Sequence, residues 1–277
     1  MKNIFYSVIE IFKVSGKRIK RVFQTKAGHM NGMDKLRLRF MRSGDMNKFK
    51  IFQHPVFFSF HPYWFRHSFR EIFEEQVYKF TATSDPLLII DCGSNIGLSI
   101  IYFAWNHPSA HIIAFEPDKK IFELLKKNVG EFGYISRVEL HNQAVWTEDT
   151  LLKFHSTGSL GGSIQKESSD KENIVEVEAV RLKNFLNQKV DFLKLDIEGP
   201  EIEVLTDCQS LLGNVKNIFV EYHCQKNEEQ KLDFLLRLLS QSGFRYYIRQ
   251  AYENMNYPYI QKHGEFMDVQ LNIFGFR

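Results

Sequence analysis

Cysteine is scarce in this sequence, and the patterns in which cysteine usually does chemistry are missing. The 277 residues include three cysteines, Cys92, Cys208 and Cys224, and no two of them have C-x-x-C spacing. An odd number of scattered cysteines argues against a disulfide framework and provides no zinc site. We therefore expect a reducing compartment and a cytoplasmic protein.

Long apolar runs are also missing from the N-terminal region. Its apolar stretches are too short to span a bilayer, and no small-residue cleavage site of a secretory signal follows them. Residues 1–24 instead have apolar side chains at helical spacing, with a basic second half that contains Lys13, Lys17, Arg18, Lys20 and Arg21. The pattern predicts a basic amphipathic helix. Two interpretations stay open: peripheral contact with the inner face of a membrane, or packing against the protein itself or a second subunit.

Acidic residues are rare in the first quarter of the chain. Residues 1–70 hold 15 lysines and arginines but only three acidic residues, whereas residues 71–277 hold 21 basic and 30 acidic ones. The small net charge of +3 therefore conceals a basic N-terminal region and an acidic remainder. Such a region can pair with the acidic part of its own chain, or with anionic lipid, glycan or nucleic acid.

The G-x-G-x-x-G motif that a dinucleotide pyrophosphate requires is missing as well. In its place, residues 87–97 read Leu-Leu-Ile-Ile-Asp-Cys-Gly-Ser-Asn-Ile-Gly, and an apolar helical pattern follows at once. This order predicts a buried strand, a tight turn and a helix, with a second strand that ends at Glu116. The glycines let a ligand approach the backbone closely, and the helix points its first amides at the turn.

Two carboxylates indicate which nucleotide such a turn would bind. Asp91 beside the turn would repel a pyrophosphate but suits the ammonium or sulfonium of S-adenosylmethionine. Glu116 can accept hydrogen bonds from ribose hydroxyls. We therefore expect S-adenosylmethionine rather than NAD, bound through Asp91, Gly93, Ser94, Asn95, Gly97 and Glu116.

The remaining pattern predicts two regions. Residues 1–80 are expected to form a basic N-terminal extension and lid segment, with a hairpin within 52–60 and a helix over 64–80. Residues 81–277 alternate strands and helices, which implies a mainly parallel sheet. We expect strands over 87–91, 111–116, 137–141, 190–195 and 215–222, helices over 97–106, 119–129, 199–212 and 228–240, and a final antiparallel pair over 244–249 and 267–274.

A further antiparallel pair is expected over 151–155 and 174–180. The long polar loop between them, residues 156–173, is interpreted as an acceptor-side loop, with plain mobility as the alternative. At residue 118, an aspartate immediately before an apolar helical pattern predicts a helix N-cap.

Five motifs occur in an order that resembles the FkbM family of S-adenosylmethionine-dependent methyltransferases: Asp91–Gly97, Phe115–Pro117, Asn142–Val145, Leu193–Gly199 and Val220–His223. The resemblance runs from about Ile72 to Phe276. It implies an α/β, Rossmann-like class I methyltransferase fold: a mainly parallel seven-stranded sheet with an antiparallel last strand, here with an N-terminal helical and aromatic extension. It also implies O-methylation, often of sugars or polyketide-like products. Pro117, Ala144 and Asp196 join the expected cofactor-binding residues on this basis.

Catalysis is expected at the carboxyl ends of the strands, where ligands of open α/β sheets bind. A hydroxyl acceptor loses its proton during methyl transfer, and the candidate bases are Asp196, Glu198, His223, His155 and Lys194. We favour His223 as the base, with Asp196 near the methyl group and Glu198 as the third catalytic residue. As alternatives, His223 is a satisfied strand-end histidine, and the two acids cap the following helix. Asp196, Glu198, Glu221 and His223 could in principle form an oxygen-rich metal site, but no spacing requires one and no metal is assigned.

The function expected from these residues is S-adenosylmethionine-dependent O-methylation of a small molecule or glycan. A non-catalytic S-adenosylmethionine-binding module is one alternative, and a nucleic-acid methyltransferase is another. The basic N-terminal region is the only support for nucleic acid. The sequence lacks the Asn/Asp-Pro-Pro-aromatic motif for base amines, and Cys92 and Cys208 are badly placed for attack on cytosine. The oligomeric state is left open.

Overall fold

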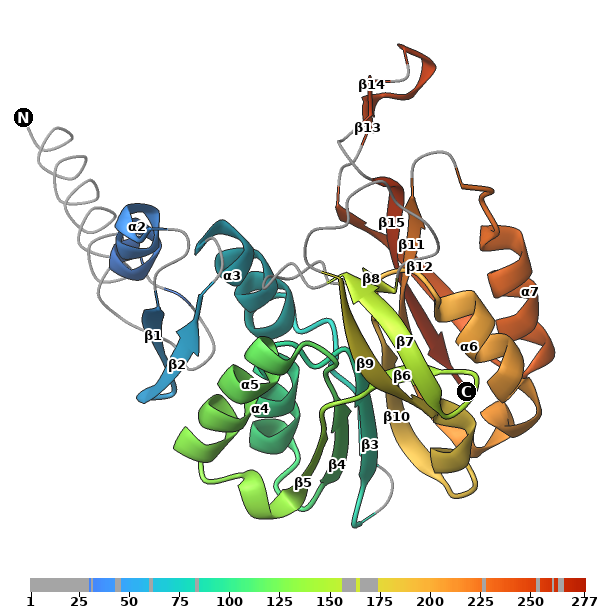
Figure 1. The fold of residues 1–277 in the computed structure, drawn as a ribbon, viewed down its shortest axis with the longest axis horizontal. Helices are drawn as coiled ribbons and strands as arrows, with labels where there is room; N and C mark the ends of the chain where they lie inside the picture. The colour runs from blue at the N-terminus through green and yellow to red at the C-terminus, as the bar shows by residue number, and fades with distance from the viewer. Residues whose placement is uncertain are drawn as a thin grey trace, which may run out of the picture. The chain divides into compact units, whose positions relative to one another are not determined.

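The structure is a computed structural model, and it divides into two compact units, residues 1–77 and 78–277 (Figure 1). It describes residues 30, 32–42, 46–59, 62–82, 85–155, 163–164, 174–225, 228–252, 255–260, 262–263 and 267–277. The helix expected over 1–24 and nearly all of the loop expected over 156–173 lie outside these residues. Within them, no helix combines the length and the apolar character needed to cross a membrane.

A seven-stranded sheet forms the centre of the larger unit, in the order β12-β15-β11-β10-β3-β4-β5. Parallel pairing joins the strands from β11 to β5, and β15 runs antiparallel between β11 and β12. The expected mainly parallel sheet with an antiparallel last strand is therefore confirmed. The bounds are β3 Leu88–Cys92, β4 His111–Phe115, β5 Val138–His141, β10 Val190–Leu195, β11 Val215–Gln225, β12 Arg245–Tyr252 and β15 Met267–Phe276.

Helices cover both faces of this sheet, because its central strands are apolar on both sides. The helices are α4 (Leu98–Asn106), α5 (Lys119–Glu131), α6 (Glu201–Cys208) and α7 (Leu232–Gln241). α4 and α5 lie on one side, and α6 and α7 lie on the other (Figure 1). Ile90 and Cys92 of β3 and Leu193 and Leu195 of β10 lie at alternate positions of their strands. They share one core with Leu205 of α6 and Leu239 of α7.

The helix bounds follow from local chemistry. Asp118 caps α5 as expected, since its Oδ1 accepts hydrogen bonds from the backbone N–H groups of Lys120 (2.8 Å) and Ile121 (3.2 Å). The helix expected over 199–212 is shorter in the structure. Gly199 has a φ of 134°, so α6 starts at Glu201, and residues 209–214 form a tighter 3₁₀ helix.

A smaller four-stranded sheet, in the order β6-β9-β7-β8, belongs to the same unit. β7 (Thr150–His155) pairs antiparallel with β9 (Ile174–Arg181), as expected. The structure adds β6 (Ala144–Trp146), which pairs parallel with β9, and β8 (Ser163–Ile164). It also adds the short pair β13 (Met255–Tyr257) and β14 (Lys262–His263) between the last two long strands.

The N-terminal unit corrects two expectations. The hairpin consists of β1 (Asn47–Ile51) and β2 (His54–Phe58), so it starts before residue 52. Its turn residues Phe52 and Gln53 both have positive φ, as the tightest hairpin turns require. The helix expected over 64–80 is α3 (Pro62–Phe69) followed by one wide turn, Arg70–Glu74, and Gln76 then takes a positive φ of 53°. Among the described residues of this unit, α2 (Gly32–Phe40) precedes the hairpin.

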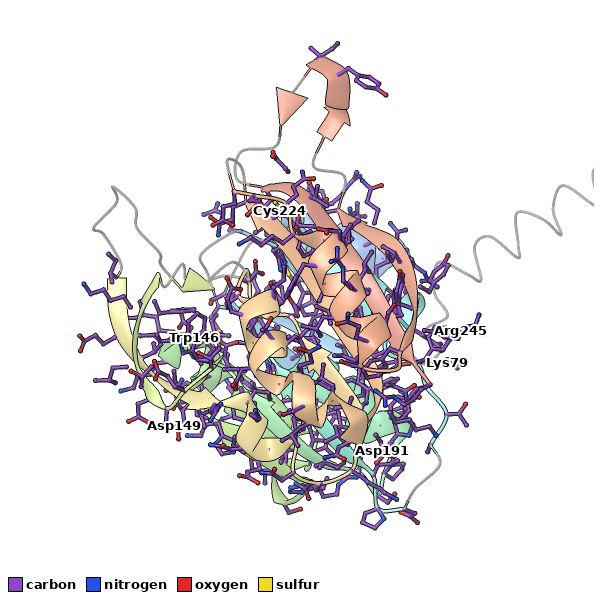
Figure 2. All side chains as sticks on the ribbon, turned by 90° about the vertical axis from the view of Figure 1, so that its right-hand side faces the viewer. Lys79, Trp146, Asp149, Asp191, Cys224 and Arg245 are labelled. Atoms are coloured by element: carbon purple, nitrogen blue, oxygen red, sulfur yellow. The ribbon has the colours of Figure 1, made fainter. Side chains whose placement is uncertain are left out.

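The two ends of the large sheet are easily told apart (Figure 2). Asp191 lies near the start of β10, where its Oδ2 accepts a hydrogen bond from Leu88 N at 3.0 Å. Cys224 lies near the end of β11, at the opposite end of the sheet (Figure 2). The parallel strands therefore present their carboxyl ends at the same edge as Cys224.

Candidate functional site

The glycine turn follows β3 at this carboxyl edge. Gly93 and Gly97 have φ values of 82° and 89°, so both adopt the left-handed conformation that glycine tolerates best. A Cβ added to Gly93 would lie 1.8 Å from the carbonyl oxygen of Asp196. Gly93 N and Ser94 N donate to Phe115 O at 3.0 and 2.9 Å. The turn is therefore held between the end of β4 and the segment after β10, with no room for a side chain at Gly93.

Glu116 lies directly after β4 and is joined to the turn. Its Oε2 accepts a hydrogen bond from Asn95 N, and its Oε1 accepts one from Asp118 N, both at 2.9 Å. Burial raises the pKa of Glu116 to about 7, although these two backbone donors act to lower it. Each carboxylate oxygen keeps a second lone pair, which leaves it able to accept from a ligand hydroxyl.

Asp91 lies beneath the turn. Its side chain is fully buried, and its Oδ2 accepts a hydrogen bond from Ser99 Oγ at 2.5 Å. Lys194 Nζ lies 3.3 Å from Asp91 Oδ1 and 3.2 Å from Asp196 Oδ2, and it donates to Gly93 O at 2.8 Å. The charge of Asp91 is thus compensated by Lys194. Direct contact of Asp91 with a cofactor stays a prediction.

Lys194, one of the candidate bases, is buried and keeps its proton. Burial alone would lower the pKa of its ammonium group, but Asp196 and Asp91 outweigh burial and raise it. Its side chain links the end of β10 to the glycine turn. Its role is therefore to support the turn.

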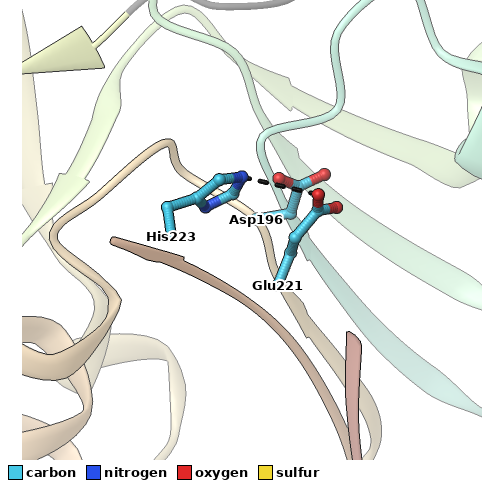
Figure 3. Close-up of side chains that lie close together, drawn as sticks. All are labelled: Asp196, Glu221 and His223. Atoms are coloured by element: carbon cyan, nitrogen blue, oxygen red, sulfur yellow. Dashed lines mark ion pairs between the residues drawn. The ribbon is translucent and has the colours of Figure 1, made fainter. Parts of the chain in front are cut away.

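The other predicted catalytic residues form a cluster of carboxylates around one imidazole. Asp196 and Glu198 follow β10, whereas Glu221 and His223 lie two residues apart on β11 and face the same side. Figure 3 shows the side chains of Asp196, Glu221 and His223 pointing toward one another. His223 Nε2 lies 3.5 Å from Glu221 Oε1 and 3.6 Å from Glu198 Oε2. The structure thus brings all three predicted catalytic residues together.

Glu201, in the first turn of α6, holds the imidazole of His223 at its Nδ1 atom. Its Oε1 accepts hydrogen bonds from Ile197 N (3.2 Å) and Gly199 N (3.1 Å), and it lies 3.0 Å from His223 Nδ1. Since this oxygen already acts as an acceptor, Nδ1 is the protonated nitrogen that donates to it. Nε2 therefore faces Asp196 and Glu221.

Several groups in the cluster hold protons more tightly than usual. Burial alone would lower the pKa of His223, but Glu198 and Glu201 outweigh it and raise the pKa well above the usual value. Burial raises the pKa of Glu198 to about 8, against the opposing effect of His223. Burial and Asp196 raise the pKa of Glu221. The surrounding carboxylates thus favour the protonated imidazole, whereas the sequence predicted a base that titrates near neutrality.

Sequence reasoning missed Glu201 altogether. The backbone N–H groups ahead of α6 bond to Glu201, whereas Asp196 and Glu198 were expected to cap that helix under one interpretation. One sequence signal for Glu201 was available: it lies two residues after the motif Leu193–Gly199. The contact with β11 depends on tertiary packing.

The other predicted residues lie around the turn or away from it. Asn142 Nδ2 donates to the backbone oxygens of Glu116 and Pro117 at 2.9 and 3.0 Å, which fixes the segment after β4. Ala144 is buried at the start of β6. His155 ends β7, and its side chain lies outside the described residues.

Strand order, glycine turn and the acid after β4 together define a class I methyltransferase, a Rossmann-like α/β fold. Residues 91–246 match the model of the methyltransferase FkbM domain, and the chain belongs to this family. S-adenosylmethionine is therefore its cofactor. The residues present fit this group, because the bare backbone at Gly93 permits close approach and Glu116 can accept from ribose hydroxyls.

Curated relatives are similar in sequence over part of their length. "Methyltransferase 1" of Beauveria bassiana is 29% identical over 160 residues, which cover 49% of this chain and 64% of that protein. "2-O-methyltransferase NoeI" of Sinorhizobium fredii is 24% identical over 177 residues, which cover 57% and 71%. A solved structure of a methyltransferase FkbM from Methylobacillus flagellatus is 15% identical, with a TM-score of 0.46 over 70% of this chain and 45% of that one.

Proposed function

We propose that this methyltransferase acts on a hydroxyl group of a small molecule or glycan. The observation that carries the proposal is the contact between Gly93 and the carbonyl of Asp196, because it joins the cofactor turn to the carboxylate–imidazole cluster. A hydroxyl acceptor needs a group that removes its proton beside the methyl donor, and the cluster lies there. The similarity to a protein named as a 2-O-methyltransferase agrees with this choice.

The exposure of the cluster residues suggests a role for each. The side chains of Asp196 and Glu198 are both 22% exposed, whereas that of His223 is 1% exposed and that of Glu201 is fully buried. An acceptor can therefore touch the first two but not the last two. We assign Glu198 as the group that takes the hydroxyl proton and Asp196 as the group that aligns the hydroxyl. His223, favoured as the base from sequence, instead holds Glu198 in place.

Bound S-adenosylmethionine supplies a sulfonium-activated methyl group. The protein then has two tasks: to align the acceptor oxygen with that methyl carbon and to receive the proton. Alignment of this kind can contribute roughly 7–11 kcal/mol, and a positioned base roughly 10²–10⁴-fold in rate. The second contribution is the one that Glu198 is proposed to make.

The test is methyl transfer from isotopically labelled S-adenosylmethionine to a panel of sugars, glycans and hydroxylated small molecules, with mass spectrometry of the product. A methyl ether in the product is the expected result. Glu198→Gln should lower kcat by about 10²–10⁴-fold while the affinity for S-adenosylmethionine is retained. Glu123→Gln, on the exposed side of α5, is the matched control and should change neither quantity.

Methyl groups recovered only on nitrogen would contradict the O-methyl proposal. Tight S-adenosylmethionine binding without transfer to any acceptor would favour a non-catalytic binding module. In either case the calorimetric affinity for the cofactor is measured in parallel, so that an unfolded variant is recognised.

We also propose that residues 1–24 bring the protein to an anionic membrane surface. Support comes from their basic amphipathic pattern. In the same unit, α2 exposes Leu36 and Phe40 beside the exposed Arg37 and Arg39. Apolar side chains among arginines are suited to the boundary between lipid headgroups and acyl chains.

A further inference from the structure

Two carboxylates and one imidazole converge at the carboxyl edge of the sheet. One oxygen each of Asp196 and Glu221 and one ring nitrogen of His223 lie within 4.8 Å of one another. Figure 3 shows these three side chains directed toward a common point. We propose that Asp196, Glu221 and His223 bind a divalent cation of the Mn²⁺ and Mg²⁺ class.

Glu201 orients the imidazole of His223 for cation binding. Ligating histidines commonly donate their second ring N–H to a carboxylate, which fixes the tautomer and the ring orientation. Here His223 Nδ1 donates to Glu201 Oε1 at 3.0 Å, and the same oxygen is held by the backbone N–H groups of Ile197 and Gly199. Glu201 therefore directs Nε2 toward Asp196 and Glu221, although it contacts no cation itself.

The partners of His223 Nε2 are carboxylates at longer distances. The His223 side chain is 1% exposed, and its neighbours Glu221 and Glu198 lie 3.5 and 3.6 Å away. These separations exceed the 2.7–3.2 Å usual for nitrogen–oxygen hydrogen bonds. A buried ring nitrogen directed at two carboxylates, with neither oxygen within the usual hydrogen-bond distance, is a second feature, besides the acidic cluster, that agrees with a ligand between them.

The charge balance agrees with a cation. Lys194 is shared between Asp91 and Asp196, so it cannot compensate the rest of the cluster. Carboxylates crowded around a single imidazole repel one another in surroundings of low dielectric constant. Four of them belong to this cluster: Asp196, Glu198, Glu201 and Glu221. A dication would offset this repulsion at the point where three of the groups meet.

The ligand set restricts the choice of metal. Carboxylate oxygens suit Mg²⁺ and Mn²⁺, and one imidazole favours Mn²⁺ between the two. With three protein ligands, the remaining coordination positions are open to water or to an acceptor oxygen. If the O-methyl proposal holds, the cation would bind the acceptor hydroxyl and ease the loss of its proton to Glu198. That role rests on the proposed function, whereas cation binding itself does not.

Cation binding is tested on the full chain after chelator treatment and dialysis. Addition of MnCl₂ is followed by the loss of the free Mn²⁺ signal in electron paramagnetic resonance. We expect saturable binding of one Mn²⁺ per chain, with pulsed spectra that detect the ¹⁴N nucleus of a coordinated imidazole. Glu221→Gln should weaken binding at least tenfold, and Glu201→Gln about 10–100-fold, as expected of a group that orients a ligand.

The controls separate this inference from the proposed function. Glu123→Gln should bind Mn²⁺ as the unchanged protein does, and retained S-adenosylmethionine affinity shows that each variant is folded. Absence of saturable Mn²⁺ binding, or binding that Glu221→Gln leaves unchanged, would overturn the inference. Methyl transfer to hydroxyls that persists in chelator-treated protein without Mn²⁺ binding would retain the proposed function and reject the metal. Mn²⁺ binding without any methylation of hydroxyl groups would retain the metal site and reject the proposed function.

Discussion

The carbonyl oxygen of Asp196 occupies the space that a side chain on Gly93 would need, 1.8 Å from the position of its Cβ. This contact joins two segments that are about a hundred residues apart in the chain. It brings the turn expected to hold the cofactor against the start of the carboxylate cluster. A change at either residue should therefore affect both parts of the site.

Gly93→Ala is expected to abolish S-adenosylmethionine binding. The new methyl group would collide with the backbone at Asp196, and alanine is strained at a φ of 82°. Calorimetry measures the affinity, and urea unfolding measures the stability, which should fall by at least about 1–3 kcal/mol.

Two glycines serve as controls for that variant. Gly133 has a φ of 72° but no atom within 4 Å of its added Cβ, so Gly133→Ala isolates the backbone strain. Gly130 lies within α5 and also has open space, so Gly130→Ala should raise stability by about 0.5–1 kcal/mol. Equal cofactor binding by Gly93→Ala and Gly133→Ala would contradict the steric explanation.

Lys194→Met is expected to destabilise the protein strongly. It would leave Asp91 as a fully buried carboxylate without its cationic partner, and breaking a buried pair in this way costs about 3–5 kcal/mol. The double variant Asp91→Asn with Lys194→Met should recover part of that loss. Urea unfolding of the two single variants and the double variant gives the coupling energy, and strictly additive effects would show that the two residues do not interact.

Cofactor affinity should increase as the pH rises through about 7. The pKa of Glu116 is raised to about 7 by burial, and only the ionised carboxylate offers both oxygens as acceptors to ribose hydroxyls. Glu116→Gln should bind S-adenosylmethionine more weakly and lose this pH dependence. Titration calorimetry of both proteins between pH 6 and 8.5 isolates Glu116, because ionisation of the cofactor itself is common to both. A parallel rise in the variant would refute the assignment.

The same raised pKa has a defined effect on stability. A carboxyl group that binds its proton more tightly in the folded state than in the unfolded state loses stabilising free energy as the pH rises. For Glu116 this loss begins near its ordinary pKa and is complete above about pH 7. The unfolding free energy of Glu116→Gln, measured relative to the unchanged protein, should therefore increase between pH 5 and pH 8.

Deletion of residues 1–24 should release the protein from vesicles that contain anionic lipid while S-adenosylmethionine binding is kept. The deleted segment supplies both apolar and basic side chains for a membrane surface. Cosedimentation with vesicles of anionic and of neutral lipid measures the effect. Unchanged sedimentation after the deletion would refute the membrane proposal.

Much of the fold could be predicted because its signals are local. Apolar runs that end in an acid or a glycine gave the central strands, and Asp118 before an apolar pattern gave the start of α5. The first strand of the hairpin was hidden because Lys48 and Lys50 alternate with Phe49 and Ile51, so a basic segment concealed a strand pattern. The helix after the hairpin ended early because Gln76 takes a left-handed conformation that no sequence pattern indicates.

The site was less predictable because its contacts are not local. Strand-end positions correctly grouped Asp196, Glu198 and His223, since parallel strands finish at one edge. Whether Asp91 faces a ligand or a lysine depends on β3 lying beside β10, a pairing between residues more than a hundred positions apart. The partner of His223 is likewise set by the packing of α6 against β11. It follows that Asp196, Glu198 and His223 could be grouped from sequence, whereas the contact with Glu201 and the orientation of the imidazole require the packed fold.

The excursion from β12 through β13 and β14 to β15 has a consequence for how such a fold diversifies. It extends beyond the edge of the sheet at which the parallel strands end (Figure 1), and Tyr259 and Ile260 within it are exposed. β13 and β14 pair with each other in a sheet of their own. Insertion or replacement there therefore leaves the hydrogen bonds of the seven-stranded sheet intact. Related chains can therefore vary this excursion while they keep the strands and the glycine turn of the seven-stranded sheet.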